Sequence, residues 1–213
     1  IATITLALDA ISNPKSIVVK EKVERYVKMI REENSRMLSQ VESVLRISQL
    51  ERSNEPIQKS SIDFHDIIKN SINHIDLILK SKSGKLKTNF NADNSFIYGN
   101  NSHMTNIVIN LLDNALKYCE QTPEVIIETF NKDSDFIFKI KDNGIGMTPS
   151  VQKKVFEKFY RVSSGNIHNT KGHGLGLAYV KHIIDIHKGS INLESKKDKG
   201  TTISVSVPNE RLT

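Results

Sequence analysis

A glycine-rich loop at the end of a strand constrains the fold of this chain more than any other stretch. Residues 135–142 alternate apolar and polar side chains, which predicts a half-buried strand. The segment Asp142–Met147, with the sequence DNGIGM, follows directly. Its two glycines permit positive φ angles and a close approach to a flat or anionic group, while the Asp142 carboxylate can accept a hydrogen bond from a ligand. Asp-Asn-Gly is also an ordinary turn sequence, so the loop alone leaves a ligand site and a simple turn equally open.

A second glycine-rich segment, Gly172–Leu177 (GHGLGL), leads into a helical pattern that contains Val180, Ile183 and Ile184. A glycine-rich turn at a helix N-terminus is a ready anion site, because free backbone amides and the positive end of the helix dipole point outward there. Rossmann and P-loop sites fit poorly, since no strand precedes the glycines and no Gly-Lys-Ser/Thr follows them. Residues 162–173 are polar and lack an apolar period, which predicts a lid or binding loop.

Three asparagines mark the helix predicted over residues 102–118. Asn106, Asn110 and Asn114 are spaced by four and share one helix face, and Lys117 lies one turn beyond Asn114 on the same side. Asparagine is a mediocre helix former, so three on one stripe indicate that they are used. Side-chain carbonyl oxygens suit Mg²⁺, and an ammonium group suits phosphate oxygens. A stripe of interhelical hydrogen bonds is the alternative explanation.

The first third of the chain predicts a helical hairpin. A short helix ends near Asn13–Pro14, and a second helical pattern runs from about Val18 to about Glu51. The first residue, Ile1, already lies within the short helix, so we expect the sequence to be part of a longer protein. In the second helix, residues spaced alternately by four and three form a heptad seam: Val23, Val27, Ile30, Asn34, Met37, Val41, Val44 and Ser48. Apolar neighbours widen this seam into a face that suits a helical bundle. Because such a face is best buried against a copy of itself, we expect a homodimer through a four-helix bundle.

A polar stretch with Pro56 separates the hairpin from a region of strands and helices. We expect a hairpin domain over residues 1–52, a linker over 53–61 and a second domain over 62–213. The predicted helices of the second domain cover residues 64–79, 102–118, 150–157 and the segment after Gly176. The predicted strands cover residues 62–64, 85–90, 95–98, 124–130, 135–140, 190–194 and 201–207. The fold class is therefore α+β, a helical hairpin followed by a two-layer α/β sandwich.

Composition excludes several classes of protein. Cys119 is the only cysteine, which excludes an intrachain disulfide and a cysteine-rich metal site and is typical of a reducing compartment. No apolar run approaches the roughly 18 residues of a membrane span, and no signal peptide is present. We therefore expect no membrane contact by this part of the protein.

The net charge of +6 leaves an anionic partner open. Much of it comes from lysines at turn-like stretches, which are more typical of solvated loops: Lys80, Lys82, Lys85, Lys87, Lys196, Lys197 and Lys199. Nucleic-acid binding ranks low, because the sequence has neither an aromatic platform nor a basic helix.

Taken in order, these stretches resemble the catalytic core of sensor histidine kinases. Asn110–Tyr118 (NLLDNALKY) is similar to the asparagine box of that family, and Asp142–Met147 to its first glycine box. The phenylalanine box, the second glycine box and a further glycine box are matched by Phe156–Arg161 (FEKFYR), Gly172–Leu177 and Gly200–Thr202. The resemblance covers essentially the whole chain. It implies a Bergerat-type ATP-binding domain, as in the gyrase, heat-shock chaperone, histidine kinase and mismatch-repair superfamily, with ATP and Mg²⁺ as ligands.

The resemblance also implies a role for each matched residue. Asp142 would accept a hydrogen bond from the adenine amino group, with Gly144, Gly146 and Thr202 around the base. Asn114 would coordinate Mg²⁺, with Asn110 nearby. The residues that would contact the phosphates or the adenosine are Lys117, Tyr118, Arg161, Gly172, Gly174, Leu175 and Gly176. Lys158 departs from the arginine that is common at its position, so we leave it outside the expected site.

Asn110 also distinguishes the branches of the superfamily. Members that hydrolyse ATP carry a glutamate at this position as the general base for water, and asparagine cannot take a proton. The resemblance therefore favours transfer of the γ-phosphate to a histidine in the first hairpin helix, and then to an aspartate of a response regulator receiver domain. The histidines lie at positions 65, 74, 103, 168, 173, 182 and 187, so we expect the acceptor histidine and its acidic base to lie upstream of Ile1.

This sequence should then bind Mg-ATP without autophosphorylating, as a cytoplasmic fragment of an inner-membrane sensor. The alternative is a nucleotide-binding regulatory module that transfers no phosphate. Phosphate transfer by a longer form of the protein distinguishes the two.

Overall fold

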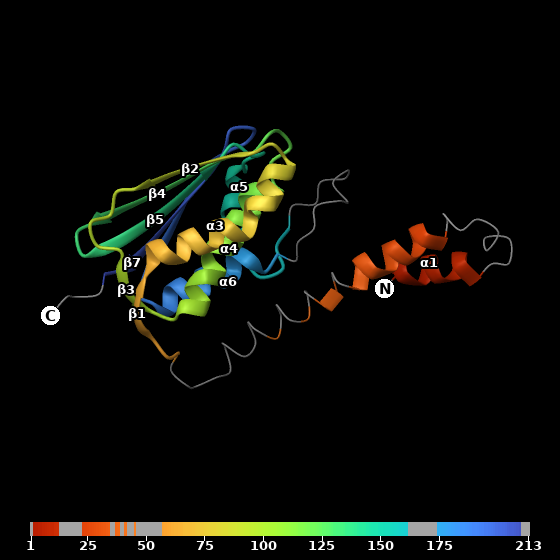
Figure 1. Cartoon of the computed structure of the whole chain (residues 1–213), viewed down its shortest axis with the longest axis horizontal. Coiled ribbons are helices and arrows are strands. Elements are labelled where there is room, and N and C mark those ends of the chain that lie inside the picture. Colours follow the sequence, from red (N-terminus) through yellow and green to blue (C-terminus); the bar gives the residue numbers. More distant parts are fainter. Residues whose placement is uncertain are drawn as a thin grey trace. The chain divides into compact units, whose positions relative to one another are not determined.

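The computed structural model describes residues 2–12, 23–34, 37–38, 41, 45, 57–161 and 174–209. The chain divides into two compact units, residues 1–54 and residues 55–213. Figure 1 shows helices in the first unit and both helices and strands in the second. The division after Asn54 lies inside the stretch that the sequence predicts to be a linker.

The first unit is helical. Helix α1 spans Ala2–Ser12, and residues 23–34 form a second helix, with residues 37, 38, 41 and 45 also helical. Much of its apolar surface is open, since Leu6 is 70% exposed and Leu38 is 61% exposed. The predicted turn between the helices and the seam positions Val44 and Ser48 lie outside the described residues.

The second unit is a mixed sheet with helices on one face (Figure 1). The strand order is β2-β4-β5-β7-β6, and only the neighbours β2 and β4 are parallel among these described strands. The strands are β2 (Lys85–Phe90), β4 (Glu124–Lys132), β5 (Asp135–Asp142), β6 (Ser190–Lys196) and β7 (Gly200–Pro208). Strands β1 (Ser60–Asp63) and β3 (Phe96–Gly99) form a separate two-stranded sheet. The covering helices are α3 (Phe64–Ser81), α4 (Asn101–Lys117) and α6 (Gly176–Ile186). The predicted α+β class is confirmed.

Local sequence explains where two of these helices begin. The Asp63 carboxylate accepts a hydrogen bond of 2.9 Å from the backbone N–H of His65 at the start of α3. The side-chain oxygen of Asn100 accepts one of 3.1 Å from the backbone N–H of His103 at the start of α4. Such N-caps satisfy backbone donors that have no partner inside the helix, and each contributes about 1 kcal/mol.

The hydrophobic core lies between the helices and the sheet. Phe64 of α3 packs against Phe136 and Phe138 of β5, with ring centroids 5.1 and 5.6 Å apart. Helix α4 contacts both α3 and α6 and buries one apolar face: Met104, Ile107, Val108, Leu111, Leu112, Ala115 and Leu116. The asparagines lie outside this buried face, and Asn110 lies beside Gly176 at the start of α6.

The register of the sheet decides which polar residues face the helices. In β5, Phe136, Phe138 and Ile140 are buried, so alternation places Asp142 on the same, helix-facing side. In β7, the buried residues Ile203, Val205 and Val207 place Thr201 on that side and Thr202 on the other. Thr202 is the register partner of the exposed residues Lys141 and Glu194.

One predicted helix is much shorter than expected. The sequence predicts a helix over residues 150–157, whereas α5 spans only Pro149–Gln152. Beyond it the backbone makes hydrogen bonds three residues apart, from Lys154 N–H to Val151 O (3.0 Å) and from Glu157 N–H to Lys154 O (2.8 Å). These are turns rather than α-helix, and they redirect the chain toward Gly174. At the other end of the unit, Ser60 and Ser61, expected in the linker, begin β1.

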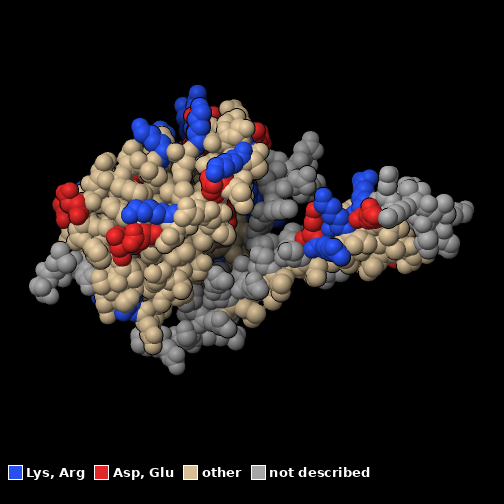
Figure 2. Space-filling model, in the orientation of Figure 1, with Lys and Arg blue, Asp and Glu red and all other residues tan. Residues whose placement is uncertain are grey.

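Charged side chains of both signs share the surface of the second unit. Figure 2 shows Lys and Arg interspersed with Asp and Glu over the visible face. Lys80 Nζ lies 2.6 Å from the Asp76 carboxylate, and Lys85 Nζ lies 3.5 Å from that of Glu124. These pairs are solvent-exposed, so each contributes about 0–1 kcal/mol. None of the described helices is long and apolar enough to cross a membrane.

Candidate functional site

Asp142 is the last residue of β5, and its carboxylate is held in one orientation. Its Oδ1 accepts hydrogen bonds from the backbone N–H of Gly144 at 2.9 Å and of Thr201 at 3.1 Å. Within the described part of the chain, its Oδ2 makes no hydrogen bond. Burial raises the pKa of this carboxyl, and the two backbone hydrogen bonds oppose the shift without cancelling it. A fixed, partly desolvated acceptor of this kind suits a ligand that donates an N–H.

The glycines after Asp142 let the loop pass between two other segments. A Cβ on Gly144 would lie 2.5 Å from the backbone oxygen of Tyr118, and one on Gly146 would lie 2.0 Å from that of Lys196. Gly146 has a φ of 60°, which favours glycine. Between them, Ile145 N–H donates to Tyr118 O at 2.9 Å. The loop therefore makes close contacts with protein backbone, and its approach to a flat or anionic ligand stays a prediction.

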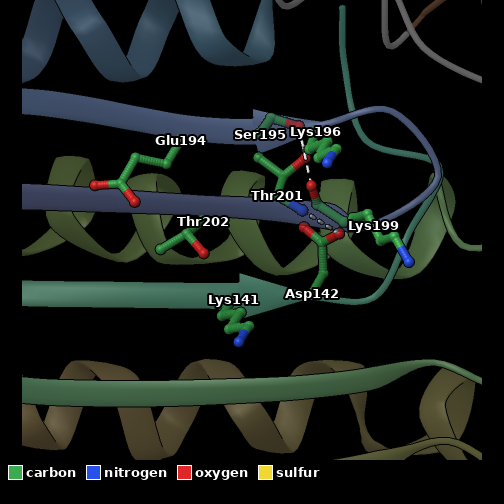
Figure 3. A pocket seen from close by; sticks show the side chains of 9 residues that line it. Lys141, Asp142, Glu194, Ser195, Lys196, Lys199, Thr201 and Thr202 are labelled. Carbon is green, nitrogen blue, oxygen red and sulfur yellow. Dashed lines mark hydrogen bonds between the residues drawn. The ribbon is translucent and has the colours of Figure 1, made fainter.

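The turn between β6 and β7 packs against this glycine loop. Ser195 of β6 accepts a hydrogen bond of 2.8 Å from the backbone N–H of Met147, and Asp198 N–H donates to Ile145 O at 2.7 Å. A hollow of about 280 Å³ lies at this end of the sheet (Figure 3). Its lining comes from β5, β6, β7 and the turn: Lys141, Asp142, Glu194, Ser195, Lys196, Lys199, Gly200, Thr201 and Thr202.

The two neighbouring threonines of β7 both line this hollow but lie on opposite faces of the sheet. Thr202 is expected beside the base, but its side chain lies on the face of the sheet away from the helices, in register with Lys141. Thr201 lies beside Asp142 instead, joined to it by the backbone hydrogen bond drawn in Figure 3. The reason is the two-residue period of a strand, in which a shift of one residue changes the face.

The asparagine face of α4 meets the start of α6. The amide group of Asn110 donates to Asn106 O at 2.7 Å, and its Oδ1 lies 2.7 Å from the place of a Cβ on Gly176. The residue before α6, Leu175, provides no side-chain cap. The first backbone amides of α6 therefore lie beside Asn110 without a capping side chain, as an anion site at a helix N-terminus requires.

The end of α4 connects the asparagines to the first glycine loop. Tyr118 N–H donates to Asn114 O at 3.0 Å, while Tyr118 O accepts from the loop. Lys117 Nζ donates to the Tyr118 hydroxyl at 3.1 Å and lies 4.6 Å from the centre of its ring. The Asn114 side chain makes no hydrogen bond to another described residue, so its amide oxygen can serve as a ligand atom.

Two residues with positive φ close the base of the predicted lid. Phe159 N–H donates to Gly174 O at 2.9 Å, and their φ angles are 64° and 69°. A Cβ on Gly174 would lie 2.7 Å from Tyr160 O, so only glycine fits. Arg161 is exposed beside this contact. Gly172, with the rest of residues 162–173, lies outside the described residues.

Sequence reasoning missed three residues that hold the loop together. Asn143 accepts a hydrogen bond of 2.8 Å from Glu124 N–H and donates one of 3.0 Å to Thr122 O. Gln152 of α5 donates to Met147 O at 3.0 Å and to Ser195 O at 2.7 Å. Ser195 had a weak signal, because it is a polar residue on the helix-facing side of a strand. The partners of Asn143 and Gln152 depend on tertiary contacts that no local pattern encodes.

A bound metal ion would take most of its ligands from the substrate rather than from the protein. Among the described residues, no cluster of three or more His, Cys, Asp or Glu side chains could hold an ion. Mg²⁺ is commonly bound through one or two protein oxygens together with phosphate oxygens and water. The amide oxygen of Asn114, which makes no hydrogen bond to another described residue, fits that chemistry.

Comparison with known families identifies this architecture. The family model for histidine kinase-, DNA gyrase B-, and HSP90-like ATPases matches residues 99–211. The chain belongs to this family. The matched region begins at the end of β3 and includes both glycine-rich segments and the asparagine helix, so the predicted resemblance to the histidine kinase catalytic core is confirmed.

Relatives of this ATPase domain are sensor proteins. The chain is 37% identical to the sensor protein RprX of Bacteroides fragilis over 210 residues, which are 98% of this chain and 40% of RprX. It is 30% identical to the sensor protein kinase WalK of Staphylococcus haemolyticus over 187 residues, 87% of this chain and 30% of WalK. The chain thus spans less than half the length of these two relatives.

Solved structures share the fold. A mycobacterial sensor histidine kinase, MprB, matches with a TM-score of 0.59 at 25% identity, over 70% of this chain and 97% of that one. The histidine kinase ThkA, in complex with the response regulator protein TrrA, matches with a TM-score of 0.77 at 18% identity, over 98% of this chain and 58% of that one. The second likeness extends over both units of the chain.

Proposed function

We propose that this chain is the catalytic core of a two-component sensor histidine kinase, which binds Mg-ATP and directs the γ-phosphate to a histidine. The main support is the way in which three parts of the site are connected. The carboxylate of Asp142, the asparagine face of α4 and the uncapped start of α6 are connected through direct contacts at Tyr118 and Gly176. A base-reading acceptor, a possible metal ligand and an anion site are thereby combined in one ATPase-family domain.

Each end of the nucleotide would meet different residues. Asp142 would accept a hydrogen bond from the adenine amino group, with Gly144 and Gly146 letting the loop approach the base and Thr201 taking the position first expected of Thr202. Tyr118 would lie beside the adenosine. Asn114, assisted by Asn110, would hold Mg²⁺, which would offset phosphate charge during transfer. The phosphates would meet Lys117, Arg161 and the amides of Gly172, Gly174, Leu175 and Gly176.

The proposed reaction is transfer rather than hydrolysis. Asn110 occupies the position of the general base that would activate water, and its amide group donates to Asn106 O, so it can take no proton. Every histidine of the chain lies at or beyond residue 65, outside the first helix, where the acceptor is expected. We therefore propose that this chain binds Mg-ATP but does not phosphorylate itself, and that the response regulator receives the phosphate only from the longer parent.

A homodimer through the first unit is part of the proposal. Leu6, Leu38 and Val41 are each more than half exposed, and covering such side chains contributes about 25 cal/mol per Å² of apolar area. A second copy of the helices is the partner that the heptad seam suits. The relatives are named sensor protein and sensor protein kinase, which supports a sensor as the parent. We propose that this parent is bound to the inner membrane, with this part in the cytoplasm.

The deciding measurement is calorimetric titration with Mg-ATP. The wild-type chain should bind, and Asp142→Ala should weaken binding by about 10- to 150-fold, as expected for a hydrogen bond to a charged group. Ser204→Ala, on the opposite face of β7, is the matched control and should bind like the wild type. If the affinity of Asp142→Ala for Mg-ATP is unchanged, the loop is only a turn and does not bind the nucleotide.

The alternative is a nucleotide-binding regulatory module that transfers no phosphate. The longer parent, incubated with γ-labelled ATP, should acquire a phosphate that is labile in acid and stable in base. A parent that binds ATP and acquires no label would favour the alternative.

A further inference from the structure

We propose that Ser195 sets the base selectivity of the site by fixing the direction of the Thr201 hydroxyl group. The inference rests on the proposed nucleotide site. Ser195 on β6 is the register partner of Thr201 on β7, and the Thr201 backbone N–H donates to Asp142 Oδ1 at 3.1 Å. Thr201 therefore lies between Ser195 and the base-reading carboxylate, as Figure 3 shows. Ser195 itself would be a positioning residue.

The hydrogen bonds of Ser195 determine which way the proton of Thr201 points. A hydroxyl group has one proton to donate and two lone pairs to accept with. Ser195 Oγ accepts from Met147 N–H at 2.8 Å and donates to Gly200 O at 3.0 Å, since a carbonyl oxygen can only accept. Its third partner is Thr201 Oγ1 at 2.9 Å. With the Ser195 proton already used, Thr201 must be the donor in that bond.

Thr201 consequently offers only lone pairs to a ligand. The ionised carboxylate of Asp142 also only accepts, so the two side chains form a surface of acceptors. Such a surface favours an N–H donor, such as the amino group of adenine, and disfavours the carbonyl oxygen that guanine carries at the same ring position. Thr201 is only 7% exposed, so an unmatched polar contact there costs more than it would in water.

Ser195 also has a purely structural task, and the two effects can be separated. Its bond to Met147 and the bond from Gln152 to its backbone oxygen at 2.7 Å hold the glycine loop. Loosening the loop should weaken the binding of every nucleotide by the same factor. Freeing the Thr201 hydroxyl should instead change the ratio of affinities, because a rotating hydroxyl can donate to guanine as well as accept from adenine.

The experiment measures Kd for Mg-ATP and Mg-GTP by calorimetry in the wild type, Ser195→Ala, Thr201→Val and the double variant. Ser195→Ala should lower the ratio of the GTP Kd to the ATP Kd by about three- to tenfold, the worth of one neutral hydrogen bond. Ser195→Thr keeps a hydroxyl group and should keep most of the ratio. In the Thr201→Val background, Ser195→Ala should change the ratio no further, because Ser195 acts through Thr201.

Three results would overturn the inference. The first is that Ser195→Ala weakens the binding of Mg-ATP and Mg-GTP by the same factor. The second is that Ser195→Ala still changes the ratio of the two Kd values fully in the Thr201→Val background. The third is that Thr201→Val alone leaves this ratio unchanged. The third result is measured on Thr201→Val alone, so the inference stays testable if the Ser195→Ala protein does not fold. A wild type that binds neither nucleotide would refute the proposed function instead. Ser204→Ala reports any general effect of removing a serine from β7.

Discussion

The side-chain oxygen of Asn110 lies 2.7 Å from the point where a Cβ on Gly176 would stand. The asparagine face of α4 and the first turn of α6 are therefore in contact, and residue 176 can carry no side chain unless Asn110 moves. Two motifs that are far apart in the sequence depend on each other at this point.

Gly176→Ala should therefore weaken Mg-ATP binding while leaving the fold intact. The added methyl group displaces the Asn110 side chain from the proposed metal and phosphate site, for which we expect a loss of roughly tenfold in affinity, about the worth of one hydrogen bond. The helix itself should gain less than about 0.5 kcal/mol, because Gly176 is its first residue and the larger advantage of alanine applies to the middle of a helix. Calorimetry measures the first effect and thermal denaturation the second.

The double variant Gly176→Ala/Asn110→Ala tests the steric cause. Removing the Asn110 side chain removes the collision, so the alanine at residue 176 should add little to the effect of Asn110→Ala alone. If it still weakens binding tenfold in that background, the contact between these two residues is not the reason.

Asp142→Asn should make the free protein more stable at neutral pH. Burial raises the pKa of the carboxyl in the folded state, so between its ordinary and raised values the folded state holds more protons than the unfolded state. The stability contributed by Asp142 then falls as pH rises through that range. An asparagine keeps the Oδ1 acceptor and carries no charge, so its advantage should be present at pH 7 and vanish below the ordinary carboxyl pKa of about 3.9.

Chemical denaturation of both proteins across pH measures this difference. Asp142→Ala, which removes the acceptor of the Gly144 and Thr201 amides, is the matched control and should gain less. A difference between wild type and Asp142→Asn that does not change with pH would contradict the role of ionisation.

Lys188→Gly should raise the free energy of unfolding by about 1 kcal/mol. Lys188 follows α6 with a φ of 56°, in the left-handed conformation that costs a residue with a Cβ about 1–2 kcal/mol. The hydrogen bonds there, from Lys188 N–H to Asp185 O and from Gly189 N–H to Ile184 O, both 3.0 Å, form the helix ending in which glycine is preferred. Denaturant melts of the two proteins give the difference.

The control for this prediction is Lys188→Ala. It removes the lysine charge, which together with the larger effect of burial lowers the pKa of Lys59, but it keeps the strained φ angle. If alanine stabilises the protein as much as glycine does, charge rather than backbone conformation accounts for the gain.

The helices and strands of the second unit follow closely from local sequence. The apolar stripe from Phe64 to Leu79 predicts α3 nearly to its ends, and alternation predicts β5. Helix α5 is the exception, because the contact of Phe159 with Gly174 overrides the local helical preference. Tertiary contacts ended that helix where propensity alone would have continued it.

The site could be predicted from sequence as a set of motifs but not as a set of contacts. The sequence indicated that Gly144 and Gly146 permit positive φ, and of the two only Gly146 adopts it. Which of Thr201 and Thr202 lies beside Asp142 did not follow from the motif, because one step along a strand changes the face of the sheet. The bonds of Ser195 depend on the register of β6 against β7 and on the return of the loop to them, which only the folded chain defines.

The hydrogen bond from Phe159 N–H to Gly174 O has a consequence for how such domains diversify. It joins the two ends of the intervening segment directly before α6, so the start of that helix is anchored independently of what lies between them. A longer insert would add only about 0.6 kcal/mol of closure entropy for each doubling in length. We therefore expect the start of α6, with the amides at Gly176, to keep its place when the length of that segment changes.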